Sequence, residues 1–438
     1  KHMLNKKRYV RMLTGLTALL LGLCGCAVPP ETTSAPSGVQ APVAPANVPE
    51  KPDAADAGGA PVTLNLADFG AAGNGQADDT AALRNAVSAV LETGGGTVYL
   101  PAGTYRLTDT LMLTGDDSAP LTLRADPTGQ TVLVADASVN GPAVWIERSG
   151  VTLFGLDIIL GTTEDQPAVL VTGSHVTLDS VTARMTAGNT QPGFLVYGSY
   201  DTLRNCGVGY VSDTQYMVVF SKMPGLDAVG NVLEDCHFGG MAGKCVLVTS
   251  EDDNGVPEQL TIRRNVFLVV GCDQVEVRAA RNLYITDNML DAAGVCVLLD
   301  PLPAGVRGVQ ITDNYCGAST GGARTGGVRT ESAYGGTLEN VIVSANYFWC
   351  PNAVRVVLPE YTGFSLTDNY FVLTGGDAVY MAAAVGAYME GNVVANIGGQ
   401  CPLRLEAVDE MTVIQGNAWG NGIEVPEWST RFAAQNSM

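Results

Sequence analysis

The sequence is poor in charge, in basic residues and in histidine. Charged side chains make up 16% of its 438 residues, against about 25% in an average globular domain. Hydrophobic residues make up 46%, which is too many for an intrinsically disordered chain. The three histidines and the cysteines show no spacing typical of zinc ligands, so the sequence argues against a zinc site.

The shortage of basic residues also bears on the binding partner. Lysine and arginine number 24 against 44 aspartates and glutamates, which gives a formal net charge of −20. The first 25 residues hold five basic and no acidic side chains, so the remainder carries 19 basic against 44 acidic groups, or −25. Such a body repels phosphate backbones, which argues strongly against nucleic-acid binding.

The N-terminus has the pattern of an export signal. A basic segment, Lys6–Arg11, precedes the apolar run Leu13–Leu23, which is short for a transmembrane helix and suits a signal peptide. Residues 23–26 read Leu-Cys-Gly-Cys, which resembles a bacterial lipobox. The resemblance implies removal of residues 1–25 and lipid attachment to Cys26; an ordinary secretory signal is the alternative.

Residues 26–60 are rich in alanine, proline, threonine and serine, with seven prolines and no apolar periodicity. Such a composition does not bury enough surface to fold, so we expect a disordered tether. It would join the lipid anchor to a folded domain at 61–438. The protein is then an exported lipoprotein on the cell surface.

From about residue 140 the chain repeats one pattern every 23 to 32 residues. Each repeat has a short apolar strand, a turn, a second strand that ends in asparagine or a substitute, and a third short strand. The endings are Leu156, Val181, Cys206, Cys236, Asn265, Asn288, Asn314, Asn346, Asn369, Asn392 and Asn417. A unit this short buries its apolar side only by stacking on its neighbours.

Three strands per repeat with asparagine at a tight corner predict an all-β parallel β-helix. Asparagine tolerates left-handed backbone angles, and its amide can bond to the asparagine one coil away. Leucine-rich repeats have a similar period, but their leucine frame is missing. With coils about 4.8 Å apart, roughly 13 coils make one elongated domain roughly 60 Å long.

The first part of this domain carries a more specific signal. Leu64–Leu113 reads as a strand, a glycine-rich turn and a helix near Thr80–Glu92 whose apolar stripe is typical of a helix that caps an open β-helix end. The capping segment 61–113 is similar to that of the pectin-lyase-like superfamily of right-handed parallel β-helices. The resemblance implies this fold but leaves the activity open, because the fold hosts lyases, hydrolases, fructan-cleaving enzymes and binders.

The opening strand of each repeat alternates two kinds of residue. One set is apolar and predicted to point inward: Val144/Ile146, Val169/Val171, Val246/Val248, Val275/Val277, Val297/Leu299, Val354/Val356, Val379/Met381 and Leu403/Leu405. The residues between them then point to solvent. Early coils expose Trp145, Leu170, Leu195, Tyr197, Val218, Phe220 and Leu247, and later coils expose Glu276, Arg278, Asp300, Arg329, Glu331, Arg355, Tyr380, Arg404 and Glu406.

The later coils therefore present a ladder of arginines and carboxylates, which is the candidate site. Parallel strands about 4.8 Å apart place the carboxylates of Asp300 and Glu331 side by side. Such a pair in a partly dry groove can act as acid and base, as in glycosidases. A salt-bridge ladder on a solvated sheet is the alternative. Substrate binding is assigned to Glu276, Arg278, Arg329, Arg355, Tyr380 and Arg404.

Two irregular segments, 250–254 and 317–327, flank this ladder, and in the pectin-lyase fold the substrate groove lies beside the longest loops. Such loops usually carry binding groups. Glu251, Asp252 and Asp253 offer oxygen ligands for Ca²⁺, as many pectate lyases do. We favour a solvated acidic turn there, and the sequence assigns no metal or other cofactor.

Asp273 resembles in position the catalytic aspartate of polygalacturonases, which makes it a third catalytic candidate beside the carboxylate pair. The other polygalacturonase motifs are absent, so an ordinary polygalacturonase is doubtful. A lyase would use an arginine as base, with Arg278, Arg281 or Arg329 available. A weak similarity to inulin fructotransferases keeps a fructan-cleaving transferase open.

The sequence predicts a surface enzyme that cleaves a polysaccharide or oligosaccharide by glycoside-hydrolase chemistry. Its partners are then the glycan and, through Cys26, the membrane. Polysaccharide lyase and fructan-cleaving transferase are alternatives within the same fold. A non-catalytic glycan-binding or adhesion module, similar to a tailspike, is the alternative outside enzymes. A homotrimer is also open, because β-helices often trimerise.

Overall fold

The computed structural model describes residues 62–438 except 116, 163–164, 187, 210–215, 241–243, 253–254, 270–271, 319–323, 359–360, 397, 399–400 and 438. The predicted signal peptide, the tether, the lipid-attachment site Cys26 and one predicted Ca²⁺ ligand, Asp253, therefore lie outside the described residues.

The strands form four parallel sheets. Sheet A contains β1 (Val62–Asn65), β3 (Gly96–Leu100), β6 (Leu121–Ala125), β9 (Val151–Phe154), β12 (Thr177–Asp179), β15 (Thr202–Arg204), β18 (Val232–Glu234), β21 (Thr261–Arg263), β24 (Ala280–Thr286), β27 (Val306–Thr312), β30 (Leu338–Ser344), β33 (Tyr361–Thr367), β36 (Tyr388–Glu390) and β39 (Val413–Gln415). Sheet B contains β2 (Asn74–Asp78), β4 (Gly103–Leu107), β7 (Thr131–Ala135), β10 (Asp157–Leu160), β13 (Thr182–Met185) and β16 (Gly207–Val208). Sheet C contains β5 (Leu111–Leu113), β8 (Val144–Ile146), β11 (Val169–Val171), β14 (Phe194–Val196), β17 (Tyr216–Lys222), β20 (Lys244–Ser250), β23 (Val275–Val277), β26 (Val295–Leu299), β29 (Gly326–Thr330), β32 (Val354–Val356), β35 (Val379–Met381) and β38 (Leu403–Leu405). Sheet D contains β19 (His237–Gly240), β22 (Val266–Val269), β25 (Met289–Ala293), β28 (Tyr315–Ala318), β31 (Tyr347–Trp349), β34 (Tyr370–Leu373) and β37 (Val393–Asn396).

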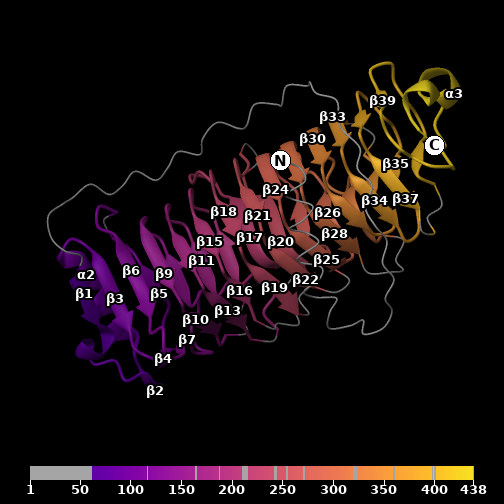
Figure 1. Cartoon of the computed structure of the whole chain (residues 1–438). Coiled ribbons are helices and arrows are strands. Elements are labelled where there is room, and N and C mark those ends of the chain that lie inside the picture. The colour runs from indigo at the N-terminus through magenta and orange to yellow at the C-terminus, as the bar shows by residue number, and fades with distance from the viewer. Residues whose placement is uncertain are drawn as a thin grey trace, which may run out of the picture. The chain divides into compact units, whose positions relative to one another are not determined.

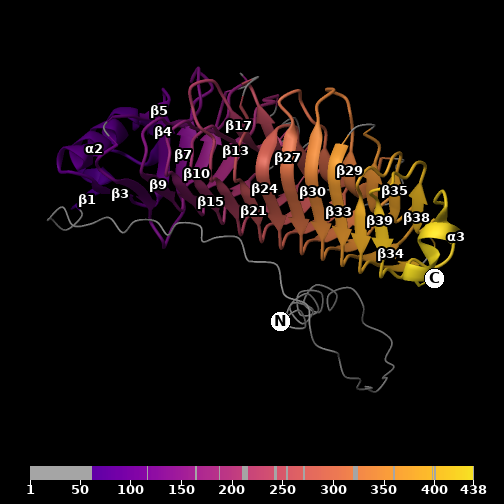
Figure 2. The same ribbon diagram turned by 90° about the horizontal axis from the view of Figure 1, so that it is seen from above.

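Each coil passes through sheet C, then sheet A, then sheet B or D, and every strand pairs in parallel with the coils before and after it (Figures 1 and 2). Sheets B and D share the third side: the backbone N–H of His237 in β19 donates to the carbonyl of Cys206, next to β16, at 3.3 Å. The predicted all-β, right-handed parallel β-helix is confirmed. No helix among the described residues is both long and apolar enough to cross a bilayer.

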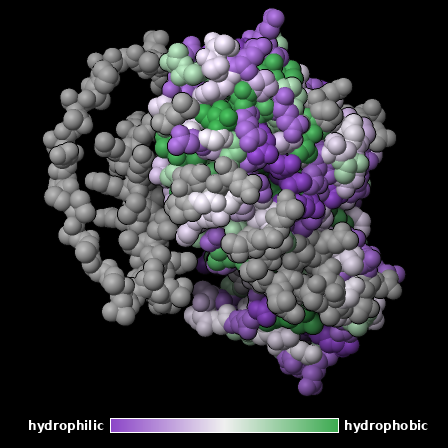
Figure 3. Space-filling model, turned by 90° about the vertical axis from the view of Figure 1, so that its right-hand side faces the viewer, coloured by the Kyte–Doolittle hydropathy of each residue, from purple (hydrophilic) through white to green (hydrophobic). Residues whose placement is uncertain are grey.

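Short helices close both ends of the coil. The helix α2 (Thr80–Glu92) has the predicted bounds and lies at the N-terminal end beside the 3-10 helix η1 (Leu66–Phe69) (Figure 1). The Asp79 carboxylate accepts the N–H of Ala72 at 2.6 Å and so holds the glycine-rich turn before α2. At the other end, α3 (Trp428–Arg431) and η2 (Ala433–Gln435) flank the buried Phe432. Seen from that end, hydrophilic side chains lie among the hydrophobic ones (Figure 3).

The asparagine column forms a ladder of buried amides. Nδ2 of Asn288 donates to Oδ1 of Asn314, and Nδ2 of Asn314 donates to Oδ1 of Asn346, both at 3.0 Å. The left-handed angles that we expected at these asparagines lie one residue earlier, as at Asp287 and Asp313. The corner is thus made by the preceding residue, which leaves each asparagine free to direct its amide along the ladder.

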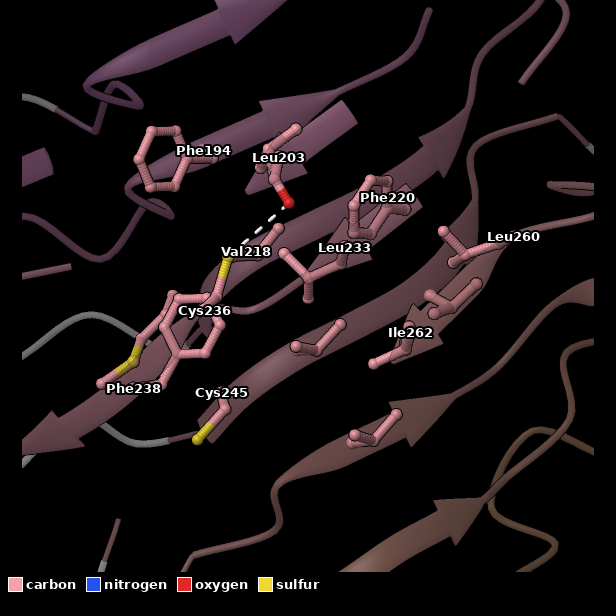
Figure 4. Close-up of a cluster of buried hydrophobic side chains, with 14 of the residues drawn as sticks. Phe194, Leu203, Val218, Phe220, Leu233, Cys236, Phe238, Cys245, Leu260 and Ile262 are labelled. Atoms are coloured by element: carbon pink, nitrogen blue, oxygen red, sulfur yellow. Dashed lines mark hydrogen bonds between the residues drawn. The ribbon is translucent and has the colours of Figure 1, made fainter. Parts of the chain in front are cut away.

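The alternation predicted for sheet C holds for all eight inward pairs, which are buried. It is wrong for Val218 and Phe220, which point inward and are fully buried with Phe194 and Leu233 (Figure 4). Pairing of Val218 with Val246 sets this phase. An unbroken apolar run such as 217–220 carries no alternation from which to read it.

Val219 takes the outward position in this coil, where it packs with Tyr216, Leu247 and Leu195. Tyr197 and Leu247, which we predicted to face solvent, are buried. The eight described cysteines are free thiols, and all but Cys272 are buried.

Candidate active site

The charged side chains on sheet C gather around strands β17 to β29. We call this group the central cluster. Its members come from the sheet and from the turns beside it: Tyr216, Lys244, Asp273, Glu276, Arg278, Asp300, Arg324, Arg329, Glu331 and Tyr334.

Register brings the predicted acid/base pair together. Val277, Leu299 and Thr330 occupy equivalent positions at the ends of β23, β26 and β29. Arg278, Asp300 and Glu331 are the residues that follow, on consecutive coils. The N–H of Asp300 donates to the Val277 carbonyl at 3.0 Å, and that of Glu331 to the Leu299 carbonyl at 2.9 Å. The two carboxylates are therefore neighbours, with Arg278 one coil before them.

Asp300 is only 4% exposed. Its Oδ1 accepts the N–H of Ala333 at 2.9 Å. Burial raises the pKa of Asp300, and the nearby charge of Glu331 adds to the rise, while the Ala333 bond and Arg278 oppose it. Asp300 thus keeps its proton to a higher pH than a free aspartate does.

Glu331 is held by two arginines. Its Oε1 lies 3.0 Å from Nε of Arg329 and 3.3 Å from Nε of Arg324. Arg324 also reaches Asp273, with Nη2 3.1 Å from Oδ2. One guanidinium therefore joins the carboxylates of Glu331 and Asp273 across the site.

Glu276 is 2% exposed, and its carboxylate lies between two cations. Nε of Arg278 lies 2.6 Å from Oε1, the Tyr216 hydroxyl donates to Oε2 at 3.0 Å, and Lys244 bonds the same oxygen. Burial alone would raise the pKa of Glu276, but Lys244 and Arg278 hold it below its usual value. Glu276 thus holds Lys244 and Arg278 in place; its predicted contact with substrate stays a prediction.

The cations Lys244 and Arg278 stay charged. Burial works against their charge, yet the bond and the charge of Glu276 leave the pKa of both above the usual value. Nη2 of Arg278 donates to the Tyr216 hydroxyl oxygen at 2.8 Å. Burial raises the pKa of the Tyr216 hydroxyl to about 12. These three groups are poor proton acceptors near neutral pH.

Asp273 completes the cluster. Oδ2 of Asp273 lies 3.5 Å from Nζ of Lys244. Asp273 precedes β23 whereas Asp300 follows β26, so the two residues lie at opposite ends of neighbouring strands. Burial raises the pKa of Asp273, while Arg324 and Lys244 lower it by less. Asp273 is thus a second carboxyl group in the cluster with a raised pKa.

The remaining predicted substrate contacts lie one to three coils further along sheet C, on β32, β35 and β38. Cζ of Arg355 lies 4.0 Å from the ring centroid of Tyr380, and the Tyr380 hydroxyl donates to Glu406 at 2.7 Å. Arg404 pairs with Glu424 at 3.1 Å. Among the described residues, Arg355 has no ion-pair partner, so its guanidinium is available to a ligand.

Four members of the central cluster escaped the sequence interpretation: Tyr216, Lys244, Arg324 and Tyr334. Lys244 lies two residues before the inward Val246, so strict alternation would have placed it in the core as well and could not have found it. Arg324 lies in the glycine-rich run 317–327, which predicts a loop but not the direction of its side chains. Tyr334, whose ring centroid is 5.0 Å from Cζ of Arg278, follows its strand with no periodic signal.

Two of the three carboxylates considered for Ca²⁺, those of Glu251 and Asp252, have partners within the chain. The Tyr197 hydroxyl donates to Glu251, and Nζ of Lys222 lies 3.3 Å from Asp252. Within the described ranges, no three His, Cys, Asp or Glu residues group as a metal site requires.

Sheet topology and comparison with known proteins point to the same fold. A family model described as "Rhamnogalacturonase A/epimerase, pectate lyase-like" matches residues 63–271, a little under half of the chain. Residues 63–271 therefore resemble the pectate-lyase-like family in sequence, and the described coil has the parallel β-helix fold of the pectin-lyase-like superfamily. Members of this superfamily carry different activities on one scaffold, so the activity of this pectin-lyase-like protein has to be argued from its site.

Solved structures with the pectin-lyase-like fold resemble this chain. The A-module of mannuronan C-5 epimerase AlgE6 from Azotobacter vinelandii has a TM-score of 0.50 at 19% identity and covers 76% of this chain and 99% of its own. The Dettilon tailspike protein has a TM-score of 0.56 at 15% identity, with 85% and 70% covered. PfbA, a surface adhesin of Streptococcus pneumoniae, has a TM-score of 0.54 at 16% identity, with 81% and 93% covered. Identities this low show the shared fold only.

Curated relatives match over a short segment. Mannuronan C5-epimerase AlgE5 of Azotobacter vinelandii is 60% identical over 43 residues, which are 10% of this chain and 4% of that protein. Alginate lyase 7 of the same organism is 56% identical over 43 residues, or 10% and 5%. The matched segment thus spans about one twentieth of the relatives' length or less.

Proposed function

We propose that the protein is a carbohydrate-active enzyme that hydrolyses a glycosidic bond over the central cluster. The observation that carries the proposal is the pairing of a nearly buried Asp300, with its raised pKa, and an ion-paired Glu331 on the adjacent coil. The superfamily match and the polysaccharide-acting relatives support glycans as the substrate class.

In this proposal Asp300 is the general acid. It protonates the glycosidic oxygen as the bond to the anomeric carbon breaks, and its raised pKa keeps the required proton on the carboxyl group. Glu331 assists from the neighbouring coil, either by taking a proton from the attacking water or by attacking the anomeric carbon itself. Asp273 is a reserve candidate for the acid because its pKa is also raised.

The cations of sheet C bind and orient the substrate. Arg329 and Arg324 hold Glu331, while Arg355 and Tyr380 offer a guanidinium and a ring one and two coils further along. A chain of sugars that runs parallel to the coil axis would cross these positions in turn. Ion pairs with fixed carboxylates keep the guanidiniums in place before substrate binds.

A second candidate is β-elimination or epimerisation on a uronate polymer. The matched segments of mannuronan C5-epimerases and of an alginate lyase favour it. The base is its weak point, because Lys244 and Arg278 stay charged and the Tyr216 hydroxyl has a pKa of about 12. A carboxylate would therefore have to accept the proton in this variant of the proposal as well.

Product analysis separates these candidates. The chain is incubated with neutral, fructan and uronate polysaccharides, and new reducing ends and the ultraviolet absorbance of unsaturated sugars are measured together. Hydrolysis predicts reducing ends without absorbance, and elimination predicts both. Epimerisation predicts neither signal but a changed uronate composition of the polymer. Binding without any of these changes, across the whole panel, would contradict an enzyme and favour an adhesion module like those among the structural neighbours.

Export, the tether and the lipid on Cys26 remain part of the proposal. They place the enzyme on the cell surface, where large glycans are accessible. Labelling of growing cells with a fatty-acid analogue tests this: wild type should take up label and Cys26→Ser should not. Equal labelling of both would contradict the lipid anchor.

A further inference from the structure

A pocket of about 340 Å³ lies on the turns that follow β11, β14 and β17. Asp300 follows β26 at the same edge of sheet C, three coils beyond β17, or roughly 14 Å at the usual strand spacing. No member of the central cluster lines the pocket. Its lining includes the rings of His175 and Tyr200 and the side chains of Ser174 and Asp227.

The two rings stand at a backbone position where five of the eight other coils have glycine. A column of residues with left-handed φ runs along the turns between sheets C and A. Register and turn hydrogen bonds align its ten members, five of which are glycines: Gly150, His175, Tyr200, Gly230, Gln259, Asn282, Gly308, Asn340, Gly363 and Gly386. Tyrosine is uncommon at such an angle, whereas asparagine and histidine adopt it more readily.

The two rings also stack on each other. The His175 and Tyr200 rings stack with centroids 5.1 Å apart and planes 11° apart, while Tyr200 remains 51% exposed. A Cβ atom on Gly230 would come within 2.7 Å of Cδ1 of Tyr200, so the glycine of the next coil makes room for the ring. The backbone strain of a left-handed tyrosine persists mainly where function requires it.

The chemistry of the lining points to an uncharged sugar. Among the described residues, the imidazole of His175, the hydroxyl of Tyr200 and the carboxylate of Asp227 have no hydrogen-bond or ion-pair partner. Together they offer donors and acceptors for sugar hydroxyls beside aromatic carbon. The lining contains no lysine or arginine, so it lacks the cation that a uronate would need. The volume lies at the small end of the usual range for ligand pockets, about 300 to 1,000 Å³.

We propose that this pocket binds a neutral sugar residue of the glycan, as a subsite remote from the bond that is cleaved. The proposal rests on the function proposed above for its substrate class. It adds that the glycan carries an uncharged sugar some three coils from the cleaved bond, held by Tyr200, His175 and Asp227.

The first test observes the pocket directly in the full chain. Asp300→Asn prevents turnover, and only three histidines are present, so ¹⁵N-histidine NMR resolves the His175 ring. Neutral hexasaccharides of glucose, galactose, mannose and fructose are added in turn, with a hexagalacturonate as the charged comparison. A neutral hexasaccharide should shift the His175 signals and leave those of His237 in place.

The second test removes the rings without adding strain. Tyr200→Gly and His175→Gly give each turn the residue that five other coils have at this position, so the unfolding midpoint should stay or rise. Calorimetric affinity for the neutral hexasaccharide should fall about tenfold. Gln259→Gly makes the same backbone change outside the pocket lining and should leave affinity unchanged.

The outcomes separate the subsite from the enzyme. If Tyr200→Gly binds as wild type does, or if no neutral hexasaccharide shifts His175, the subsite is overturned even where turnover is found. If His175 responds and Tyr200→Gly binds weakly, but wild type turns over no glycan, the pocket stands and the proposed hydrolysis fails.

Discussion

Asp201 is a fully buried acid beside a buried amide, that of Asn231 on the next coil. Its Oδ1 accepts the N–H of Val176 and its own N–H donates to Oδ1 of Asn231, both at 2.8 Å, while its Oδ2 is fully buried without a partner in the described structure. Burial raises the pKa of Asp201 to about 8. The carboxyl group is therefore protonated at neutral pH and can act as a donor, as Nδ2 of Asn231 does toward the Gly198 carbonyl.

Asp201→Asn should stabilise the protein, and more so as pH rises. The unfolded chain loses this proton near pH 3.8 and the folded chain near pH 8, so wild-type stability is full below pH 3.8 and declines up to about pH 8. Asparagine supplies a permanent donor and removes that decline. Urea unfolding across this interval measures it; parallel pH dependence in the two proteins would refute the assignment.

The pKa of Asp300 gives a prediction for activity. Arg278 lowers this pKa, so Arg278→Gln should raise it further and move the basic limb of the kcat/KM profile to higher pH, although the rate itself falls. Arg404→Gln, on the same face but several coils away, should leave the limb where it is. A limb that stays or moves to lower pH in Arg278→Gln would show that another group donates the proton.

At the scale of elements, the amide ladder fixes the corner between sheets A and D. Asn346→Ala leaves the N–H of Asn314 and the carbonyl of Ile311 buried without their partners. We expect a loss of about 2 to 6 kcal/mol in the free energy of unfolding, since each of the two unpaired buried groups costs about 1 to 3 kcal/mol. Asn340→Gly, at an exposed left-handed position, should be neutral or stabilising. Equal losses in chemical denaturation would contradict a special role for the ladder.

The periodic elements could be predicted from the sequence because their signals are local. The bounds of α2 follow from one apolar stripe, and the inward pairs of sheet C follow from alternation. The prediction that Val218 and Phe220 face solvent was wrong because every residue from 217 to 220 is apolar. Only the pairing of this strand with β20 shows which of them point inward. The left-handed residue at the asparagine corner was predicted one position too late. The sequence shows that an asparagine is present, but not that its side chain points inward along the ladder while the preceding residue makes the turn.

At the scale of the whole molecule, the candidate site combines residues that repeat with residues that do not. Arg278, Asp300 and Glu331 repeat with the coil and were predicted. Arg324 and Tyr334 lie on turns, and their approach to the sheet depends on loop packing across coils. The ion-pair network around Glu276 also joins buried charged groups from several strands, so the sequence of one strand alone does not predict it.

If the substrate crosses several coils, the effect of a binding-site variant on KM should depend on the length of the oligosaccharide. Arg355 lies one coil beyond Arg329 and has a ring contact but no ion-pair partner among the described residues. Arg355→Leu should therefore raise KM about tenfold for long oligosaccharides with little change in kcat, and leave the shortest substrates unaffected. Steady-state kinetics on a series of chain lengths measures this; an equal effect at every length would place Arg355 outside the substrate path.

The most direct test of the account compares turnover and glycan affinity in Asp300→Asn and Glu331→Gln. Each variant keeps the shape of the side chain and removes its proton transfer, so kcat should fall by about 10² to 10⁴-fold while the dissociation constant for the glycan changes little. Turnover in both variants near the wild-type rate would contradict the acid/base assignment on sheet C.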